Sequence, residues 1–322
     1  MKSLYGKYRI IQVHAFPSRY SLLIQVLLLF MLSAGNIPAG EIALSFDDAP
    51  WPNQHYLSGL ERTEMLIHKL DSLDIDQVVF FCTTERLRWH HGYQRLRMYG
   101  EAGHLLGNHS YSHQRPGKIG CEAYIQDIRQ AHDSLKGMTG FVKWFRYPML
   151  DEGRTVPARD SLRSALEKLG YKNGYVTIDN YDFYLERAFQ QAIKDGRTVD
   201  YDKLRDLYIS VLWDAIRFYD DLARNALGRS PRHILLLHEN DLAALFVDEL
   251  ITHLRENGWK IISPVEAYKD SIASHVPDVL MNNQGRVAAI AREKGFERRQ
   301  LHHEAEDKAY LDSLIEKTGV FQ

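Results

Sequence analysis

The segment 42–50 reads IALSFDDAP and joins an apolar run to two adjacent carboxylates, Asp47 and Asp48. The apolar start has the composition of a buried strand and the Ala-Pro end favours a loop, so both carboxylates are predicted at the carboxyl end of a strand. Enzymes with α/β folds place catalytic groups at this end. Taken alone, an Asp-Asp pair in this position is usually a turn or a helix cap, whose side chains bind nearby backbone N–H groups.

A second cluster, HSYSH at residues 109–113, places two histidines four positions apart. Side chains at this spacing lie above one another on a helical turn, so His109 and His113 are predicted to point at one ion. One Asp with two His would supply three ligands and leave an open position, as a catalytic zinc site requires, with the second Asp free as a base. Alone, this spacing usually marks two histidines on a helix surface, but the two clusters together favour a metal site.

Apolar strand-like runs alternate with amphipathic stretches along the chain, which predicts repeated βα units and an α/β fold. The expected strands are 42–44, 78–81, 105–108, 144–146, 173–178, 234–237 and 260–262. The expected helices are 61–73, 92–102, 124–136, 161–169 and 242–257. The candidate site residues then fall at strand ends or in the loops that follow, on the catalytic face of a barrel.

Two downstream clusters complete a set of motifs that resembles the polysaccharide deacetylase family, which includes chitin, chitooligosaccharide and peptidoglycan N-deacetylases. The matching residues are 45–48, 109–113, Arg146 with Pro148, Asp182 with Phe183, and Leu236 with His238. The resemblance covers roughly residues 41–268 and keeps the family's motif order. It implies a distorted (β/α) barrel of the polysaccharide deacetylase type.

The resemblance also implies a metal-dependent hydrolase. Asp48, His109 and His113 would bind a divalent metal ion, for which Zn²⁺ is expected and Co²⁺ is the alternative. The metal would polarise an acetamide carbonyl and lower the pKa of the water that attacks it.

An acid and a base are implied for the same reaction. Asp47 would be the general base, and Arg146 would orient it and balance its charge. His238 would be the general acid that protonates the leaving amine. Asp182 would hold the imidazole of His238 and favour its protonated form.

Two departures from the family pattern are expected to alter specificity and leave the chemistry in place. Met149 stands where the family commonly has an aromatic residue whose backbone N–H helps to bind the oxyanion, and a backbone donor does not depend on the side chain. Phe183 stands where Trp is more common, so the apolar wall would be smaller and would lack an indole donor.

The expected reaction is removal of acetyl groups from an N-acetylated oligo- or polysaccharide, such as a chitin-like polymer, peptidoglycan or an exopolysaccharide. Two alternatives stay open: a non-catalytic carbohydrate-binding relative, and a hydrolase of a small non-sugar amide. The formal net charge of −2 gives no basic excess, so no nucleic-acid partner is expected. The motifs do not separate N- from O-deacetylation, and they leave the oligomeric state open.

Residues 1–35 have the layout of a secretory signal peptide, with basic residues, an apolar run at 21–32 and small residues at 33–35. This layout predicts a secreted or periplasmic protein with no stable membrane span after cleavage. The apolar run is shorter than the ~20 residues that span a bilayer. An uncleaved membrane anchor is the alternative.

The remaining chain is expected to form one catalytic domain, residues 41–274, with a helical insertion at about 184–227. Residues 275–322 are predicted to be a helical extension packed on the barrel. Two cysteines, Cys82 and Cys121, are too few to impose a disulfide framework, and whether they pair is left open.

Overall fold

The computed structural model describes residues 40–322. The predicted signal peptide or anchor at residues 1–35 lies outside this range. Among the helices that the structure describes, none is long and apolar enough to cross a membrane.

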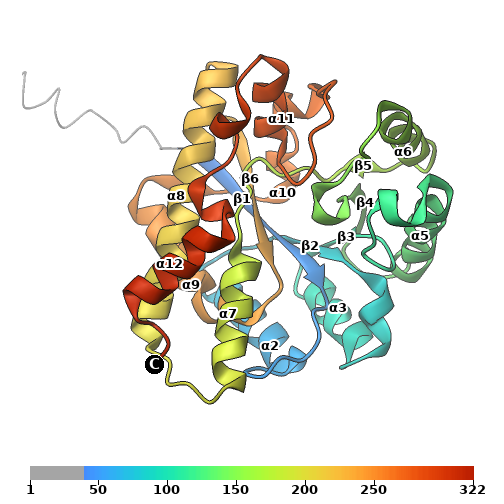
Figure 1. Cartoon of the computed structure of the whole chain (residues 1–322). Coiled ribbons are helices and arrows are strands. Elements are labelled where there is room, and N and C mark those ends of the chain that lie inside the picture. Colours follow the sequence, from blue (N-terminus) through green and yellow to red (C-terminus); the bar gives the residue numbers. More distant parts are fainter. Residues whose placement is uncertain (1–39) are drawn as a thin grey trace, which may run out of the picture. The chain divides into compact units, whose positions relative to one another are not determined.

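The described part of the chain contains a sheet of seven parallel strands (Figure 1). They are β1 (Gly40–Ala49), β2 (Val79–Cys82), β3 (Leu105–Asn108), β4 (Phe141–Phe145), β5 (Lys172–Asn173), β6 (Arg232–His238) and β7 (Trp259–Ile261). Their order is β5-β4-β3-β2-β1-β6, and β7 also pairs with β1. The strand that carries the Asp-Asp pair is therefore central, and parallel pairing places the carboxyl ends of all strands at one edge.

The sheet curls back on itself after β5. The prediction of one strand over 173–178 is wrong, because β5 covers only Lys172–Asn173. Beyond it the chain reaches β6, where Ile178 forms a parallel bridge with Leu235 and donates its backbone N–H to the carbonyl of Ile234 at 3.2 Å. The two ends of the strand order are thus brought together, and the fold is the distorted (β/α) barrel that the sequence predicted.

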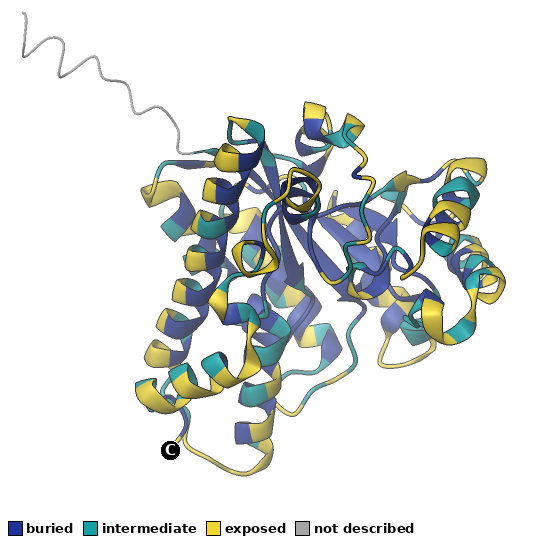
Figure 2. Ribbon diagram, turned by 45° about the horizontal axis from the view of Figure 1, so that its top comes forward, coloured by how far each residue is buried: buried dark blue, intermediate teal, exposed yellow. Residues whose placement is uncertain are grey.

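Helices cover the outer side of the sheet, and Figure 2 shows buried strands inside helices whose outward faces are exposed. The helices between the main strands are α2 (Gly59–Ser72), α3 (Gly92–Glu101), α5 (Cys121–Leu135), α6 (Val156–Lys168) and α9 (Asp241–Glu256). Each predicted helix is present. α6 begins earlier than predicted because the Thr155 side chain caps it, accepting the N–H of Ala158 at 3.3 Å.

Longer helices also begin at Asp182 and follow the last strand, β7. They are α7 (Asp182–Lys194), α8 (Tyr201–Leu227), α11 (Arg286–Glu293) and α12 (Lys308–Thr318). α8 packs against α9, α11 and α12 along its buried side. Thr198 and Gln322 exchange two backbone hydrogen bonds of 2.8 Å, so the last residue is fixed beside the connection between α7 and α8.

Neither cysteine forms a disulfide. Cys82 is buried at the end of β2 and Cys121 begins α5, and both are free thiols. Burial raises the pKa of the Cys82 thiol well above its usual value. Cys82 is therefore a packed apolar side chain and not a reactive group.

Candidate active site

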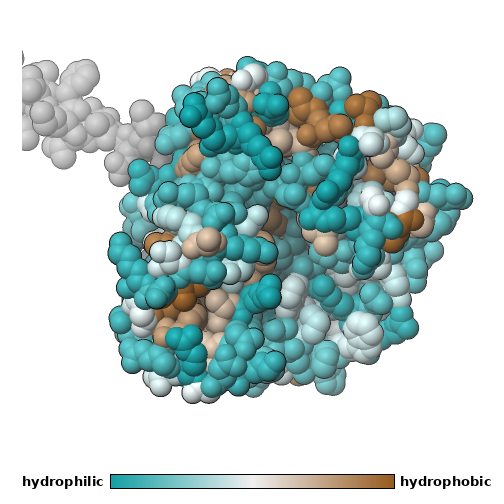
Figure 3. Space-filling model, in the orientation of Figure 1, coloured by the Kyte–Doolittle hydropathy of each residue, from teal (hydrophilic) through white to brown (hydrophobic). Residues whose placement is uncertain are grey.

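The carboxyl ends of the central strands open into a cavity of about 410 Å³. Its lining includes the predicted site residues Asp47, Asp48, His109, His113 and His238. Larger apolar side chains complete the wall, among them Trp51, Met149, Tyr181, Phe183 and Leu236. Figure 3 shows a hollow over β1, bordered mostly by hydrophilic residues.

Both carboxylates of the Asp-Asp pair reach this cavity because β1 is irregular at its end. Phe46 pairs with Phe80 and Ala49 pairs with Cys82, so β1 contains one extra residue between these two pairs. Such a bulge redirects side chains that would otherwise alternate across the sheet. Asp48, inside the bulge, has a left-handed φ of 69°.

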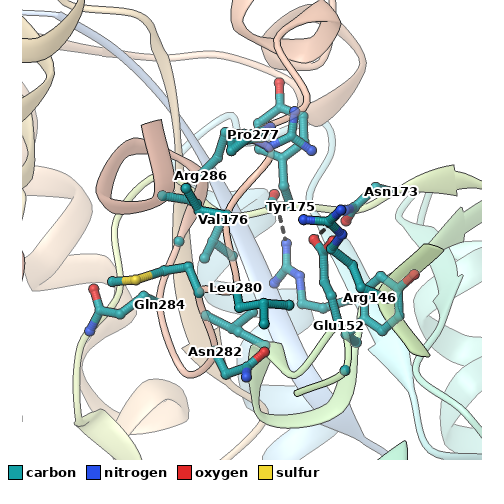
Figure 4. A pocket seen from close by; sticks show the side chains of 18 of the residues that line it. Arg146, Glu152, Asn173, Tyr175, Val176, Pro277, Leu280, Asn282, Gln284 and Arg286 are labelled. Carbon is teal, nitrogen blue, oxygen red and sulfur yellow. Dashed lines mark hydrogen bonds between the residues drawn. The ribbon is translucent and has the colours of Figure 1, made fainter. Parts of the chain in front are cut away.

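Arg146 binds the carboxylate of Asp47. Its Nη1 donates to Asp47 Oδ1 at 2.6 Å, and its Nε donates to the carbonyl of Gly174 at 2.6 Å. Figure 4 shows Arg146 beside Tyr175 at a small cavity of about 40 Å³. Burial raises the pKa of Asp47 to about 6, although Arg146 opposes this shift. The carboxylate is therefore ionised at neutral pH and still basic enough to accept a proton.

The second carboxylate has different neighbours. Thr83 Oγ1 donates to Asp48 Oδ1 at 3.1 Å, and Arg86 Nη1 lies 3.3 Å from the same oxygen. His113 Nε2 is also 3.3 Å from it. Burial alone would raise the pKa of Asp48, but His113 and Arg86 lower it below its usual value. Asp48 is thus held ionised, as a metal ligand must be, while the adjacent Asp47 can exchange a proton.

The prediction that His109 and His113 share a helical turn is wrong. Ser110 and His113 have left-handed φ angles of 69° and 56°, and the segment forms a tight loop after β3. Ser110 Oγ accepts the N–H of His113 at 3.0 Å, and the Asp127 carboxylate on α5 accepts the two intervening N–H groups at 3.0 and 3.1 Å. The loop brings the two imidazole centroids to 5.0 Å from each other.

Asp48, His109 and His113 form a group that could hold a metal ion, with ligand atoms within 4.8 Å of one another. His109 Nδ1 lies 2.8 Å from the carbonyl of Arg146. Because a carbonyl only accepts, Nδ1 carries the proton and Nε2 presents its lone pair. Burial lowers the pKa of both imidazoles, which favours the neutral form that binds metals. One carboxylate and two imidazoles suit a divalent cation such as Zn²⁺.

His238 and Asp182 form a second charged pair at the cavity. His238 Nδ1 lies 2.6 Å from Asp182 Oδ1, and the other carboxylate oxygen accepts the backbone N–H of His238 at 2.8 Å. Burial alone would lower the pKa of His238, but Asp182 raises it to about 9. Phe183 packs against the imidazole at a steep angle, with ring centroids 5.5 Å apart. The imidazole is therefore fixed in orientation and protonated at neutral pH.

Part of the chain matches a known protein family. Residues 34–174 match the family model described as polysaccharide deacetylase. The resemblance to that family is confirmed. A curated relative, the peptidoglycan-N-acetylglucosamine deacetylase of Bacillus cereus, is 26% identical over 119 residues. That match covers 37% of this chain and only 39% of the relative.

Solved polysaccharide deacetylase structures have the same fold. The polysaccharide deacetylase Bc1974 from Bacillus cereus superposes with a TM-score of 0.51 at 17% identity, over 70% of this chain and 91% of that one. A CE4 family pseudoenzyme from Bacillus anthracis gives a TM-score of 0.50 at 18% identity, over 71% and 66% of the two chains. These likenesses confirm the predicted barrel.

Sequence reasoning missed one carboxylate in the wall of this cavity. Asp179 is buried and lines the cavity, and its Oδ1 accepts only the N–H of the next residue, Asn180, at 2.8 Å. Burial raises its pKa well above the usual value. A signal was available, because Asp179 ends the apolar run 175–178 and precedes Asp182 by three residues.

A buried ion-pair network beside His238 was also missed. Arg95 donates to both oxygens of Glu239 at 2.7 and 2.8 Å, and both side chains are fully buried. Glu239 also accepts the backbone N–H of Trp51 at 2.5 Å. The residue after His238 therefore fixes the loop that carries an aromatic wall of the cavity.

Proposed function

We propose that this protein is a hydrolase that removes acetyl groups from an N-acetylated glycan with the help of a divalent metal ion. The observation that carries the proposal is that Asp47, His238 and the Asp48–His109–His113 group all line one cavity. Hydrolysis of an acetamide requires each part, because its carbonyl is a poor electrophile and its amine leaves only when protonated.

Asp48, His109 and His113 would hold the cation, for which Zn²⁺ is the first expectation and Co²⁺ the alternative. A bound cation would polarise the acetamide carbonyl and make the attacking water more acidic. The ligands stand at a strand end and in a loop tied to α5, so their positions are set by rigid elements.

Asp47 is proposed to take the proton of the attacking water. Its Oδ1 is occupied by Arg146 at 2.6 Å, whereas its Oδ2 faces the ligand group and lies 3.7 Å from His109 Nε2. Oδ2 is therefore the proton acceptor. Arg146 keeps the carboxylate oriented and balances its charge in a buried site.

His238 is proposed to give the second proton. Asp182 holds Nδ1, so Nε2 is the atom available to the cavity. As the C–N bond breaks, the proton passes from Nε2 to the amine, which departs neutral, and the acetyl group leaves as acetate.

A glycan substrate is supported by the name of the curated relative, which refers to peptidoglycan N-acetylglucosamine. Trp51, Tyr181 and Phe183 offer aromatic surfaces in the cavity wall against which a sugar ring can pack. Peptidoglycan, a chitin-like polymer and an exopolysaccharide are the candidates. A secreted or periplasmic location, proposed from residues 1–35, would bring the enzyme to such polymers.

A non-catalytic binding protein is the second candidate, because one of the structural neighbours is a pseudoenzyme. The presence of the base, the three metal ligands and the acid in this chain favours the enzyme. A hydrolase of a small non-sugar amide would use the same groups and is separated from a glycan deacetylase only by its substrate.

Acetate release tests these proposals. The full-length protein is incubated with chitooligosaccharides, peptidoglycan, acetylated xylan and a small acetamide, with and without chelator. We expect release from an N-acetylated glycan, loss of release on chelation and recovery with Zn²⁺ or Co²⁺, while Asp47→Asn stays far slower than the wild type with either metal. Binding of a glycan without acetate release by metal-loaded protein would favour the binding protein, and release from the small amide alone would exclude the glycan substrate.

A further inference from the structure

A second concavity adjoins the candidate active site. Its volume is about 660 Å³, and it shares Tyr181 and Asn283 with the wall of the active-site cavity. The segment 280–306, between the barrel and α12, supplies most of its lining. A glycan whose acetylated sugar lies between Asp47 and His238 would extend into this neighbouring groove.

Basic side chains line the groove from three separate segments of the chain. Arg154 comes from the loop after β4, Arg292 from α11, and Arg298 from the 3-10 helix η4 (Arg298–Gln300). All three are exposed. Among the described residues, neither Arg292 nor Arg298 has a carboxylate oxygen within ion-pair distance, and Arg292 donates only to the carbonyl of Phe296 at 3.2 Å.

Nearby acids neutralise the positive charge of the groove only in part. Arg154 pairs with Asp151 at 3.2 Å, but the same buried carboxylate also pairs with Arg115 at 2.9 Å, so one negative charge serves two guanidinium groups. In the wall of the active-site cavity, Lys308 lies 5.8 Å from the ring of Tyr184 and has no ion pair among the described residues.

Glu306 is the one carboxylate among the described residues that line the groove, and it faces the interior. Its side chain is 3% exposed. It accepts hydrogen bonds from the Tyr219 hydroxyl, the Gln284 amide and the backbone N–H of His303. Its oxygens are thus engaged by these donors and form no ion pair with Arg154, Arg292 or Arg298.

We propose that this groove binds anionic groups of the substrate, so that the preferred substrate is an acidic N-acetylated glycan. The inference rests on the proposed deacetylase function and narrows its substrate class. The guanidinium fork matches the planar oxygen pair of a carboxylate and also the oxygens of a phosphate. A neutral chitin-like chain has no anionic group with which these arginines could form an ion pair, so their guanidinium groups would stay hydrated. Exposed basic side chains also attract an anionic chain over a Debye length of about 8 Å at physiological salt.

Binding to matched tetrasaccharides tests the inference without turnover. Calorimetry on full-length protein carrying Asp47→Asn compares hyaluronan tetrasaccharide, in which N-acetylglucosamine alternates with glucuronate, with neutral tetra-N-acetylchitotetraose. We expect tighter binding of the acidic ligand, with a preference that falls as salt rises. In a third arm, a phosphodiester-linked tetramer of N-acetylhexosamine distinguishes phosphate from carboxylate as the preferred anion.

The variant Arg292→Ala/Arg298→Ala tests the groove itself. Each exposed charge contact contributes modestly, so we expect the affinity for the preferred acidic ligand to fall about 5- to 20-fold at low salt. Arg299→Ala is the matched control, because Arg299 lies on the same turn, its side chain is 84% exposed and pairs with Glu297 at 2.9 Å, and it does not line the groove. Arg298→Lys should retain part of the preference, and circular dichroism checks that each variant is folded.

Equal affinity for the acidic and neutral ligands, or an equal loss in the Arg299→Ala control, would overturn the groove assignment. A different result would refute the proposed deacetylase function. If wild-type protein loaded with metal released no acetate from any glycan, that function would be wrong even where the arginine variants lost acidic binding. If it released acetate from neutral tetra-N-acetylchitotetraose with no preference for acidic ligands, the function would stand and the groove assignment would be wrong.

Discussion

Asp47 and His238 are register partners on the neighbouring parallel strands β1 and β6. The backbone carbonyl of Asp47 accepts the N–H of Glu239 at 3.0 Å, which continues this pairing past the end of β6. The proposed base and acid are therefore held at the same height of the sheet by the backbone ladder. Arg146 orients the side chain of Asp47, and Asp182 orients the imidazole of His238. Each of the two proposed proton-transfer groups therefore has its own buried partner.

The pH dependence of kcat/KM should be bell-shaped. The active form of Asp47 is ionised and is lost as pH falls through a pKa of about 6. The active form of His238 is protonated and is lost as pH rises through a pKa of about 9. A cation bound beside Asp47 favours the carboxylate and moves the acidic limb to lower pH. Initial rates of acetate release between pH 4 and pH 11 measure both limbs.

Asp182→Asn should move the alkaline limb to lower pH and leave metal content unchanged. The variant removes the charge that raises the pKa of His238, while burial continues to lower it. Elemental analysis and the same rate profile provide the two measurements. An alkaline limb that stayed in place would show that another group titrates there.

Asp47→Asn and Asp48→Asn should fail in different ways. The first should keep bound metal and lose on the order of 10²–10⁴ in rate, the usual contribution of a positioned base. The second should bind metal more weakly, because Asp48 offers its oxygen to the ligand group. Metal titration monitored by calorimetry separates the two, and normal metal binding by both variants would refute the assignment.

His238→Ala should impair amides more than activated esters. An acetamide needs a proton on its leaving amine, whereas an aryl acetate has a leaving group that departs without one. Rates on an N-acetylated sugar and on an aryl acetate, measured with the same metal-loaded variant, give the comparison. Equal losses on the two substrates would contradict the acid role of His238.

Asp127→Ala should weaken metal binding although Asp127 is no ligand. Its carboxylate holds the loop that positions His113, and loss of such support typically costs 10- to 100-fold in metal affinity. Asp133→Ala is the matched control on the same helix, because Asp133 is exposed and pairs only with Lys136 at 2.6 Å. Metal affinity unchanged in Asp127→Ala would mean that the loop keeps its shape without this support.

The sequence by itself determined which candidate site residues this chain carries and that they lie at the ends of barrel strands. The apolar runs before Asp47 and before His238 predicted strands, and parallel strands end at one edge, so proximity of the motifs followed from local patterns. Alternation of strand-like and amphipathic stretches likewise predicted the βα architecture. Each strand or helix buries one face, so its apolar residues recur at a regular spacing in the sequence.

Only the tertiary structure decided the geometry of the ligands and the wall around them. A spacing of four residues suggested a helical turn at 109–113, but a carboxylate from α5 and left-handed backbone angles hold a loop instead. Likewise, Arg154, Arg292 and Arg298 share no local pattern, and they line one groove because residues 280–306 lie beside the loop that follows β4. The spacing of apolar residues indicates which face of a helix or strand is buried. Contacts between side chains of different segments depend on how those segments pack, which no local stretch of sequence encodes.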